Sequence, residues 1–163
     1  MTESRVNLTV VTVGKYLLLA AMAAYLVLRL FGGQVSKAPF AQVEEAVLSA
    51  AVLDPMTEGD NQLLRRVYGL EPEEYDGVCL YFPAGNMNVE ELLLVKLRDL
   101  SQQAEVKKIM EDRVAYQISV FEGYAPEQVA MLKRSVIEVR GNYLLLVVAE
   151  LPEPVRQAFL KAL

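Results

Sequence analysis

The chain has 163 residues and no histidine, which excludes a Ser-His-Asp or Cys-His catalytic arrangement and a zinc site of the Cys/His type. Its net charge is −5, but residues 38–163 carry 12 Lys and Arg against 20 Asp and Glu, a net charge of −8. Such an acidic stretch disfavours nucleic acid and anionic lipid headgroups as partners, and the single Cys79 excludes an intramolecular disulfide.

The segment Val10–Phe31 is the first predicted element, and it has the length and composition of a membrane-spanning helix. As a helix it would extend about 33 Å, close to the thickness of the hydrocarbon core of a bilayer. Its apolar run from Tyr16 to Leu28 is unbroken, and Lys15 and Arg29 lie at the two ends, where their charges reach the headgroups. We therefore predict an uncleaved transmembrane signal anchor.

Two alternatives remain for this segment. A cleaved secretory signal also has a basic start and a short apolar run, but the small-x-small sequence Ser36-Lys37-Ala38 is followed by Pro39. A buried core helix normally keeps a polar stripe, whereas residues 16–28 are apolar all round. The Lys and Arg residues near the segment are evenly divided between its two sides, so the positive-inside rule does not decide the orientation.

The anchor divides the chain into four predicted parts. These are a short N-terminal tail at residues 1–9, the anchor at 10–31, a linker at 32–38 and a domain at 39–163. The last part is long enough for one ordinary domain with its own hydrophobic core.

The first half of the domain shows two helical patterns followed by two strand patterns. Pro39 suits the first position of a helix, and apolar residues then recur at helical spacing to about Val52. Asp60 is suited to cap the N-terminus of the second helix, and Gly69 its C-terminus. Pro83 ends a strand of alternating residues, and the apolar run after it indicates a second strand that forms a hairpin with the first. The predicted elements are helices at 39–52 and 61–68 and strands at 78–82 and 92–97.

The second half again places helices before a hairpin. The segment Ser101–Phe121 is the clearest amphipathic helix, because its apolar residues fall on one face and its charged residues on the other. Gly141-Asn142 has the length of a hairpin loop, and the apolar run after it predicts a central strand. The predicted elements are helices at 101–121, 127–134 and 154–163 and strands at 136–140 and 143–149. This order predicts an α+β fold in which an antiparallel sheet of about four strands, in two hairpins, packs with helices.

Short motifs distributed over residues 40–150 resemble those of one bacterial family. They are DNQLL at 60–64, VYGL at 67–70, EYDGV at 74–78, MNVEEL at 87–92, RV at 113–114, FEGY at 121–124, PEQ at 126–128 and VRGNY at 139–143. The family they resemble is known as domain of unknown function 4358. The resemblance implies a protein of Gram-positive anaerobes, tethered to the membrane by an N-terminal lipoprotein or signal-anchor segment, with the domain outside. This chain has no Cys after its apolar run and so departs from the lipoprotein version.

Glu90 and Glu91 are the candidate catalytic residues, because they directly precede a predicted buried strand. One of them pointing inward would have a raised pKa, as a general acid or base requires. Alternatively, both belong to a charged cluster at the edge of the strand. Arg113 interrupts the apolar face of its helix, which predicts a buried ion pair with one of these carboxylates.

The candidate metal ligands are Asp54, Glu58 and Asp60, which surround Gly59 in a segment that breaks the helical pattern. Hard cations such as calcium prefer oxygen ligands of this kind, but the spacing does not match an EF-hand. The alternative is a solvated loop that carries a helix cap. No metal or other cofactor is expected.

The candidate binding residues are Arg113, Tyr68, Tyr124 and Asn142. Tyr is useful at binding surfaces, although Tyr residues beside turns also serve as half-buried hydroxyl anchors. Cys79 alternates with core-type residues and is predicted to pack beneath a helix.

These features predict a non-enzymatic, membrane-tethered domain that binds a protein or another ligand at the cell envelope. The alternatives are a carboxylate-dependent envelope enzyme that uses Glu90 and Glu91, or a cation-responsive sensor that uses residues 54–61. The expected partners are the membrane, through residues 10–31, and an envelope protein, but no nucleic acid. The expected location is the cell membrane, with a single span and an extracytoplasmic C-terminal domain.

Overall fold

The computed structural model describes residues 14–16, 18–22 and 35–163. The predicted tail 1–9, and residues 10–13, 17 and 23–34 of the predicted anchor and linker, lie outside the described residues. Residues 14–16 and 18–22 are helical, and within the described ranges no helix is both long and apolar enough to cross a bilayer. Gln34–Leu163 forms a compact unit by itself.

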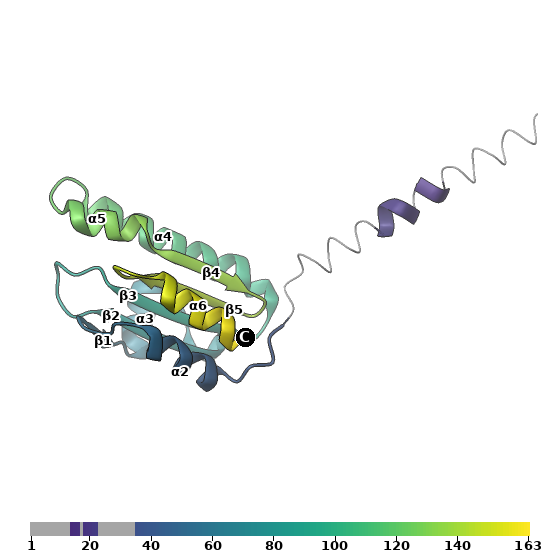
Figure 1. Ribbon diagram of the computed structural model, residues 1–163, viewed down its shortest axis with the longest axis horizontal. Coiled ribbons are helices and arrows are strands. Elements are labelled where there is room, and N and C mark those ends of the chain that lie inside the picture. The colour runs from purple at the N-terminus through teal and green to yellow at the C-terminus, as the bar shows by residue number, and fades with distance from the viewer. Residues whose placement is uncertain (1–13, 17, 23–34) are drawn as a thin grey trace, which may run out of the picture. The chain divides into compact units, whose positions relative to one another are not determined.

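The unit is built around a five-stranded antiparallel sheet with the strand order β1-β2-β3-β5-β4 (Figure 1). Both predicted hairpins are present, as β2–β3 and β4–β5, and pairing between β3 and β5 joins them. The predicted α+β class is therefore confirmed, whereas the central strand is β3, and the last strand lies inside the sheet between β3 and the edge strand β4. The strands are β1 Met56–Glu58, β2 Tyr75–Pro83, β3 Glu91–Leu97, β4 Val136–Arg140 and β5 Tyr143–Val148.

The prediction of about four strands is wrong by one, because β1 lies in the segment that was expected to be a loop. Met56, Thr57 and Glu58 pair with Pro83, Phe82 and Tyr81 along the outer edge of β2. Three residues are too few to show the alternation by which a strand is recognised in a sequence. This strand is therefore specified by its partner strand rather than by its own pattern.

Helices cover both faces of the sheet (Figure 1). On one face, α2 and α6 pack over Leu92, Leu94 and Leu145. On the other face, α3, α4 and α5 pack over Leu93 and Leu146. The helices are α2 Phe40–Ala50, α3 Asn61–Tyr68, α4 Gln103–Phe121, α5 Pro126–Lys133 and α6 Glu153–Ala162, with short 3₁₀ turns at Pro72–Glu74 and Leu100–Gln102.

The predicted ends of α3 and the predicted face of α4 are confirmed. The Asp60 side chain accepts a hydrogen bond of 2.7 Å from the N–H of Leu63, which caps the first turn of α3. Gly69 follows α3 with a φ of 67°, a left-handed conformation that glycine adopts without strain. On α4, the apolar residues at helical spacing are buried against the sheet, as at Val106 and Met110.

Residues 35–39 are fastened to one end of the domain, and we call this segment the strap. Its Ser36 N–H donates to Asn142 Oδ1 over 2.8 Å, and Ser36 Oγ donates to the carbonyl of Leu163 over 3.2 Å. The Ala38 carbonyl accepts from Tyr143 Oη at 2.8 Å and from Lys96 Nζ at 3.0 Å. The chain therefore enters the domain beside the β4–β5 turn and the C-terminal end of α6.

Candidate functional site

A cavity of about 240 Å³ lies between the C-terminal end of α2 and the N-terminal end of α6. Its floor is the sheet, where Leu92 of β3 and Val147 of β5 are almost fully buried. Because these residues begin β3 and end β5, the cavity lies at the end of the sheet opposite to the strap. The residues that line it are Ala50, Ala51, Val52, Asp54, Met56, Glu90, Leu92, Val147, Ala149, Glu150, Leu151, Pro154 and Val155.

The rim of the cavity combines exposed apolar side chains with carboxylates. Val52 is 77% exposed and Leu151 is 74% exposed, so two large apolar side chains meet the solvent beside the cavity. Asp54, Glu90 and Glu150 supply three carboxylates to the lining, whereas no Lys or Arg lines it. The lining also contains no hydroxyl, thiol or amine. The site is therefore suited to binding an apolar group, and the carboxylates of its rim are its only charged side chains.

Glu90 and Glu91 lie on opposite faces of the sheet, because successive side chains of a strand alternate. Glu90 lines the cavity on the α2–α6 face, and its Oε2 accepts a hydrogen bond of 3.1 Å from the N–H of Val89. Glu91 points beneath α4 and is only 1% exposed. The expectation that one of the two points inward is thus met by Glu91. The two carboxyl groups do not form a pair.

Glu91 is held by side chains from two helices on the α3–α4 face. Arg113 of α4 donates from Nη2 to Glu91 Oε2 at 2.9 Å and from Nε to the same oxygen at 3.2 Å. Tyr68, the last residue of α3, donates from Oη to Glu91 Oε1, and Gln117 Nε2 lies 3.5 Å from Oε2. The predicted buried pair of Arg113 with a carboxylate is confirmed, and its partner is Glu91.

The cluster of side chains around Glu91 is shielded from solvent, so it offers little surface to a ligand. The Arg113 side chain is 12% exposed, and its guanidinium lies over the ring of Phe82 at 5.2 Å from the centroid. Burial raises the pKa of Tyr68 well above its ordinary value, and the nearby Glu91 carboxylate raises it further. The phenol therefore stays protonated and donates to the carboxylate. We interpret Tyr68 and Arg113 as residues that satisfy a buried charge and fix the packing of α3 and α4 on β3.

The other two candidate binding residues lie far apart in the fold. Tyr124 is exposed in the turn between α4 and α5, with its ring 5.6 Å from that of Phe121. Asn142 is buried at the β4–β5 turn, where its side chain accepts from Ser36 in the strap. Thus the structure brings Arg113 and Tyr68 together and leaves Tyr124 and Asn142 separate.

Of the three candidate metal ligands, Glu58 and Asp60 line one open hollow beside α3, whereas Asp54 lies elsewhere. Asp54 lies on the rim of the cavity, Glu58 belongs to β1, and Asp60 caps α3. Within the described ranges, no three His, Cys, Asp or Glu residues are grouped so that they could hold a metal ion.

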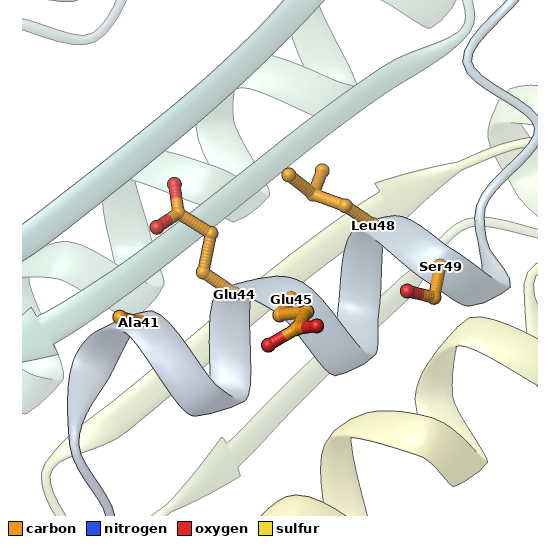
Figure 2. A pocket seen from close by; sticks show the side chains of 5 residues that line it. All are labelled: Ala41, Glu44, Glu45, Leu48 and Ser49. Carbon is orange, nitrogen blue, oxygen red and sulfur yellow. The ribbon is translucent and has the colours of Figure 1, made fainter.

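A second hollow runs along the outer side of α2 (Figure 2). Its lining comes from a single helix, and Figure 2 shows these side chains spread along successive turns without an opposing wall. The residues are Ala41, Glu44, Glu45, Leu48 and Ser49. A hollow of this kind does not enclose a ligand, so the cavity between α2 and α6 is the better candidate.

Cys79 is buried on the α2–α6 face, as predicted, in a core that it shares with Val43 and Val47 of α2. Burial, together with the nearby carboxylates of Glu44 and Glu58, raises the pKa of its thiol to about 12. The thiolate, which is the reactive form, is therefore almost absent at neutral pH.

We expect the Cys79 thiol of the folded protein to react with a disulfide reagent at pH 8 about a hundredfold more slowly than that of the urea-unfolded protein. Because the pKa of the folded form is raised from about 9.0 to about 12, the contribution of this group to stability is complete below pH 9 and is lost as the pH rises toward 12. Urea denaturation at pH 7 and pH 10.5 should therefore show a larger loss of stability for the natural chain than for Cys79→Ala. Equal losses of stability for the two chains would contradict the raised pKa of Cys79.

Most of the cavity could not be found from the sequence. Its lining comes from three separate stretches of the chain, and Val52 and Leu151 lie just beyond the ends of α2 and β5. The available signal is that Val52 continues an apolar run just beyond the end of α2, whereas Glu150 separates Leu151 from the apolar run of β5.

A family model described as a domain of unknown function, DUF4358, matches residues 49–149 of the chain. The match includes β1 to β5 and α3 to α5 and most of the residues that line the cavity. No curated protein and no solved structure matches the chain.

Proposed function

This chain belongs to the family of the domain of unknown function 4358, and from that premise we propose that it is a membrane-tethered, extracytoplasmic module that binds a partner at the cell envelope. The cavity between α2 and α6 is its binding site, and it works without catalysis. The observation that carries this proposal is the exposure of Val52 and Leu151 at the mouth of an apolar cavity. Exposed apolar surface next to a cavity is typical of a place where another molecule docks.

The position of the cavity supports this function for a tethered domain. The strap lies at the beginning of β5 and the end of α6, whereas the cavity lies at the end of β5 and the beginning of α6. At about 3.4 Å per residue, the six residues of β5 separate the two ends by about 20 Å. A partner at the cavity would thus approach the domain from the end opposite to the point where the chain enters.

The tether itself is proposed from the sequence. Residues 10–31 have the length, the apolar run and the flanking cations of a single membrane span. The acidic charge of residues 38–163 would keep the domain away from anionic headgroups rather than spread on them.

Cysteine labelling tests both parts of the proposal, because the native Cys79 is buried and unreactive. Leu151→Cys places a thiol on the cavity rim, and Tyr116→Cys places one on α4, where the native side chain is 62% exposed. In intact cells, we expect a membrane-impermeant maleimide to label Tyr116→Cys at the rate found for the purified full-length chain. We expect Leu151→Cys to be labelled at least tenfold more slowly in cells than after purification, because the partner covers it.

Two results would contradict the proposal in different ways. If neither variant is labelled until the cells are lysed, the domain is not extracytoplasmic. If both variants are labelled in cells at their purified rates, the cavity is not an occupied binding site.

A further inference from the structure

We propose that the cavity takes a segment of a partner protein that inserts one apolar side chain and places Lys or Arg residues against the carboxylates of the rim. This inference rests on the proposed function and adds the chemistry of the partner. It is carried by the size of the cavity, the exposed apolar rim and the charges that surround them.

The size of the cavity favours a single side chain over a free small molecule. Small-molecule sites usually enclose about 300–1,000 Å³. The cavity measures about 240 Å³. Val52 and Leu151 extend the apolar surface outward from this small hollow, so an occupant that fills the hollow and also covers the rim must be larger than the hollow. A protein segment with an anchor side chain meets both conditions, as the central residues of interfaces do.

The charge of the rim favours a basic segment. Asp54, Glu90 and Glu150 line the cavity without any Lys or Arg beside them. Among the described residues, no ion pair includes any of the three. Carboxylates around an apolar site attract cations and repel acidic partners, which selects the partner as well as speeding the encounter.

The outer surface of α4 differs from the rim in how its carboxylates are paired. There, Lys107 lies 3.1 Å from Glu111, and Lys108 pairs with Asp112. Glu111 and Asp112 are therefore paired within the helix, whereas no Lys or Arg lines the cavity beside the carboxylates of the rim. This contrast also supplies a matched control for the experiment.

Three capped tripeptides test the proposed chemistry on the purified full-length Leu151→Cys chain in nanodiscs of zwitterionic lipid. They are acetyl-Arg-Phe-Arg-amide, its charge-reversed form acetyl-Glu-Phe-Glu-amide, and acetyl-Arg-Ala-Arg-amide, which lacks the apolar anchor. The measurement is the peptide concentration that halves the rate at which uncharged N-ethylmaleimide labels the introduced thiol. We expect Arg-Phe-Arg to protect at a concentration about tenfold lower than either of the other two peptides.

Charge-neutralising variants identify the residues responsible. In the same background, Asp54→Asn, Glu90→Gln and Glu150→Gln together should raise the half-protecting concentration of Arg-Phe-Arg about tenfold. The control replaces three exposed carboxylates of α4 and α5, by Glu111→Gln, Asp112→Asn and Glu127→Gln, and should leave that concentration unchanged.

The possible failures are distinguishable. Equal protection by Arg-Phe-Arg and Glu-Phe-Glu would overturn the preference for a basic segment and leave the cavity as a binding site. Equal protection by Arg-Phe-Arg and Arg-Ala-Arg would overturn the apolar anchor. If no peptide protects while the Leu151→Cys thiol is still shielded in cells, the proposed chemistry of the partner is wrong and the proposed function stands. If that shielding is absent as well, both proposals fall.

Discussion

Replacing Arg113 with Met is expected to lower the free energy of unfolding by about 3–5 kcal/mol, the largest loss expected from any single charged residue of this domain. The Glu91 carboxylate is 1% exposed, and without Arg113 it keeps only neutral donors, from Tyr68 and Gln117. A buried charge without a counter-charge is costly, because water cannot reach it. The measurement is urea denaturation of the full-length chain, followed by circular dichroism.

An exposed ion pair provides the control for this experiment. Arg98 lies 3.6 Å from Asp76 with both side chains about half exposed, so Arg98→Met should cost no more than about 1 kcal/mol. Replacing both buried partners, by Glu91→Leu and Arg113→Met, should recover much of the loss, because the double variant leaves no unpaired charge. If Arg113→Met unfolds at the same urea concentration as the natural chain, the pair contributes nothing and this interpretation of the cluster is wrong.

Replacing Phe159 with Ala is expected to lower the free energy of unfolding by a similar amount, about 3–5 kcal/mol. Phe159 is fully buried between α6 and the sheet, where its ring meets that of Tyr143 edge-on at 6.4 Å between centroids. Its removal leaves a void in the core that also contains Cys79 and Val155. Urea denaturation measures the loss, and labelling of Cys79 under native conditions should become faster because α2 and α6 loosen.

The neighbouring Leu160 supplies a matched control on the same helix. It is only half-buried at the edge of this core, so Leu160→Ala should cost less than half as much as Phe159→Ala. Equal losses for the two variants would mean that α6 does not pack on the sheet through Phe159.

Much of the fold could be predicted because local chemistry and tertiary packing agree in most elements. The caps at Asp60 and Gly69 set the limits of α3, and the apolar face of α4 is visible at helical spacing. Both hairpins follow from apolar runs on either side of turn residues. β1 could not be predicted, because it consists of three residues whose conformation depends on the edge of β2.

The two parts of the candidate site differ in how far the sequence could predict them. The pair of Arg113 and Glu91 left a local signal, since a charge on the apolar face of a helix requires a buried partner. Which of Glu90 and Glu91 pairs with Arg113 depends on the register of β3. A shift of one residue would move each carboxylate to the opposite face of the sheet. The cavity left no such signal, because its walls meet only after the sheet has brought α2 and α6 together.

The strap has a consequence for how such a domain can be built into other proteins. Ser36 and Leu163 are joined by a hydrogen bond, although they are 127 positions apart in the chain. Two points of a chain that lie side by side in this way can both be joined to a surface loop of a host protein without stretching the host. For the same reason, a short peptide joining residue 163 to residue 35 should allow new termini to be opened elsewhere, for example in the exposed turn at Gly123. A host protein could therefore carry this domain as an insertion, and the cavity would lie at the end opposite to the two points of attachment.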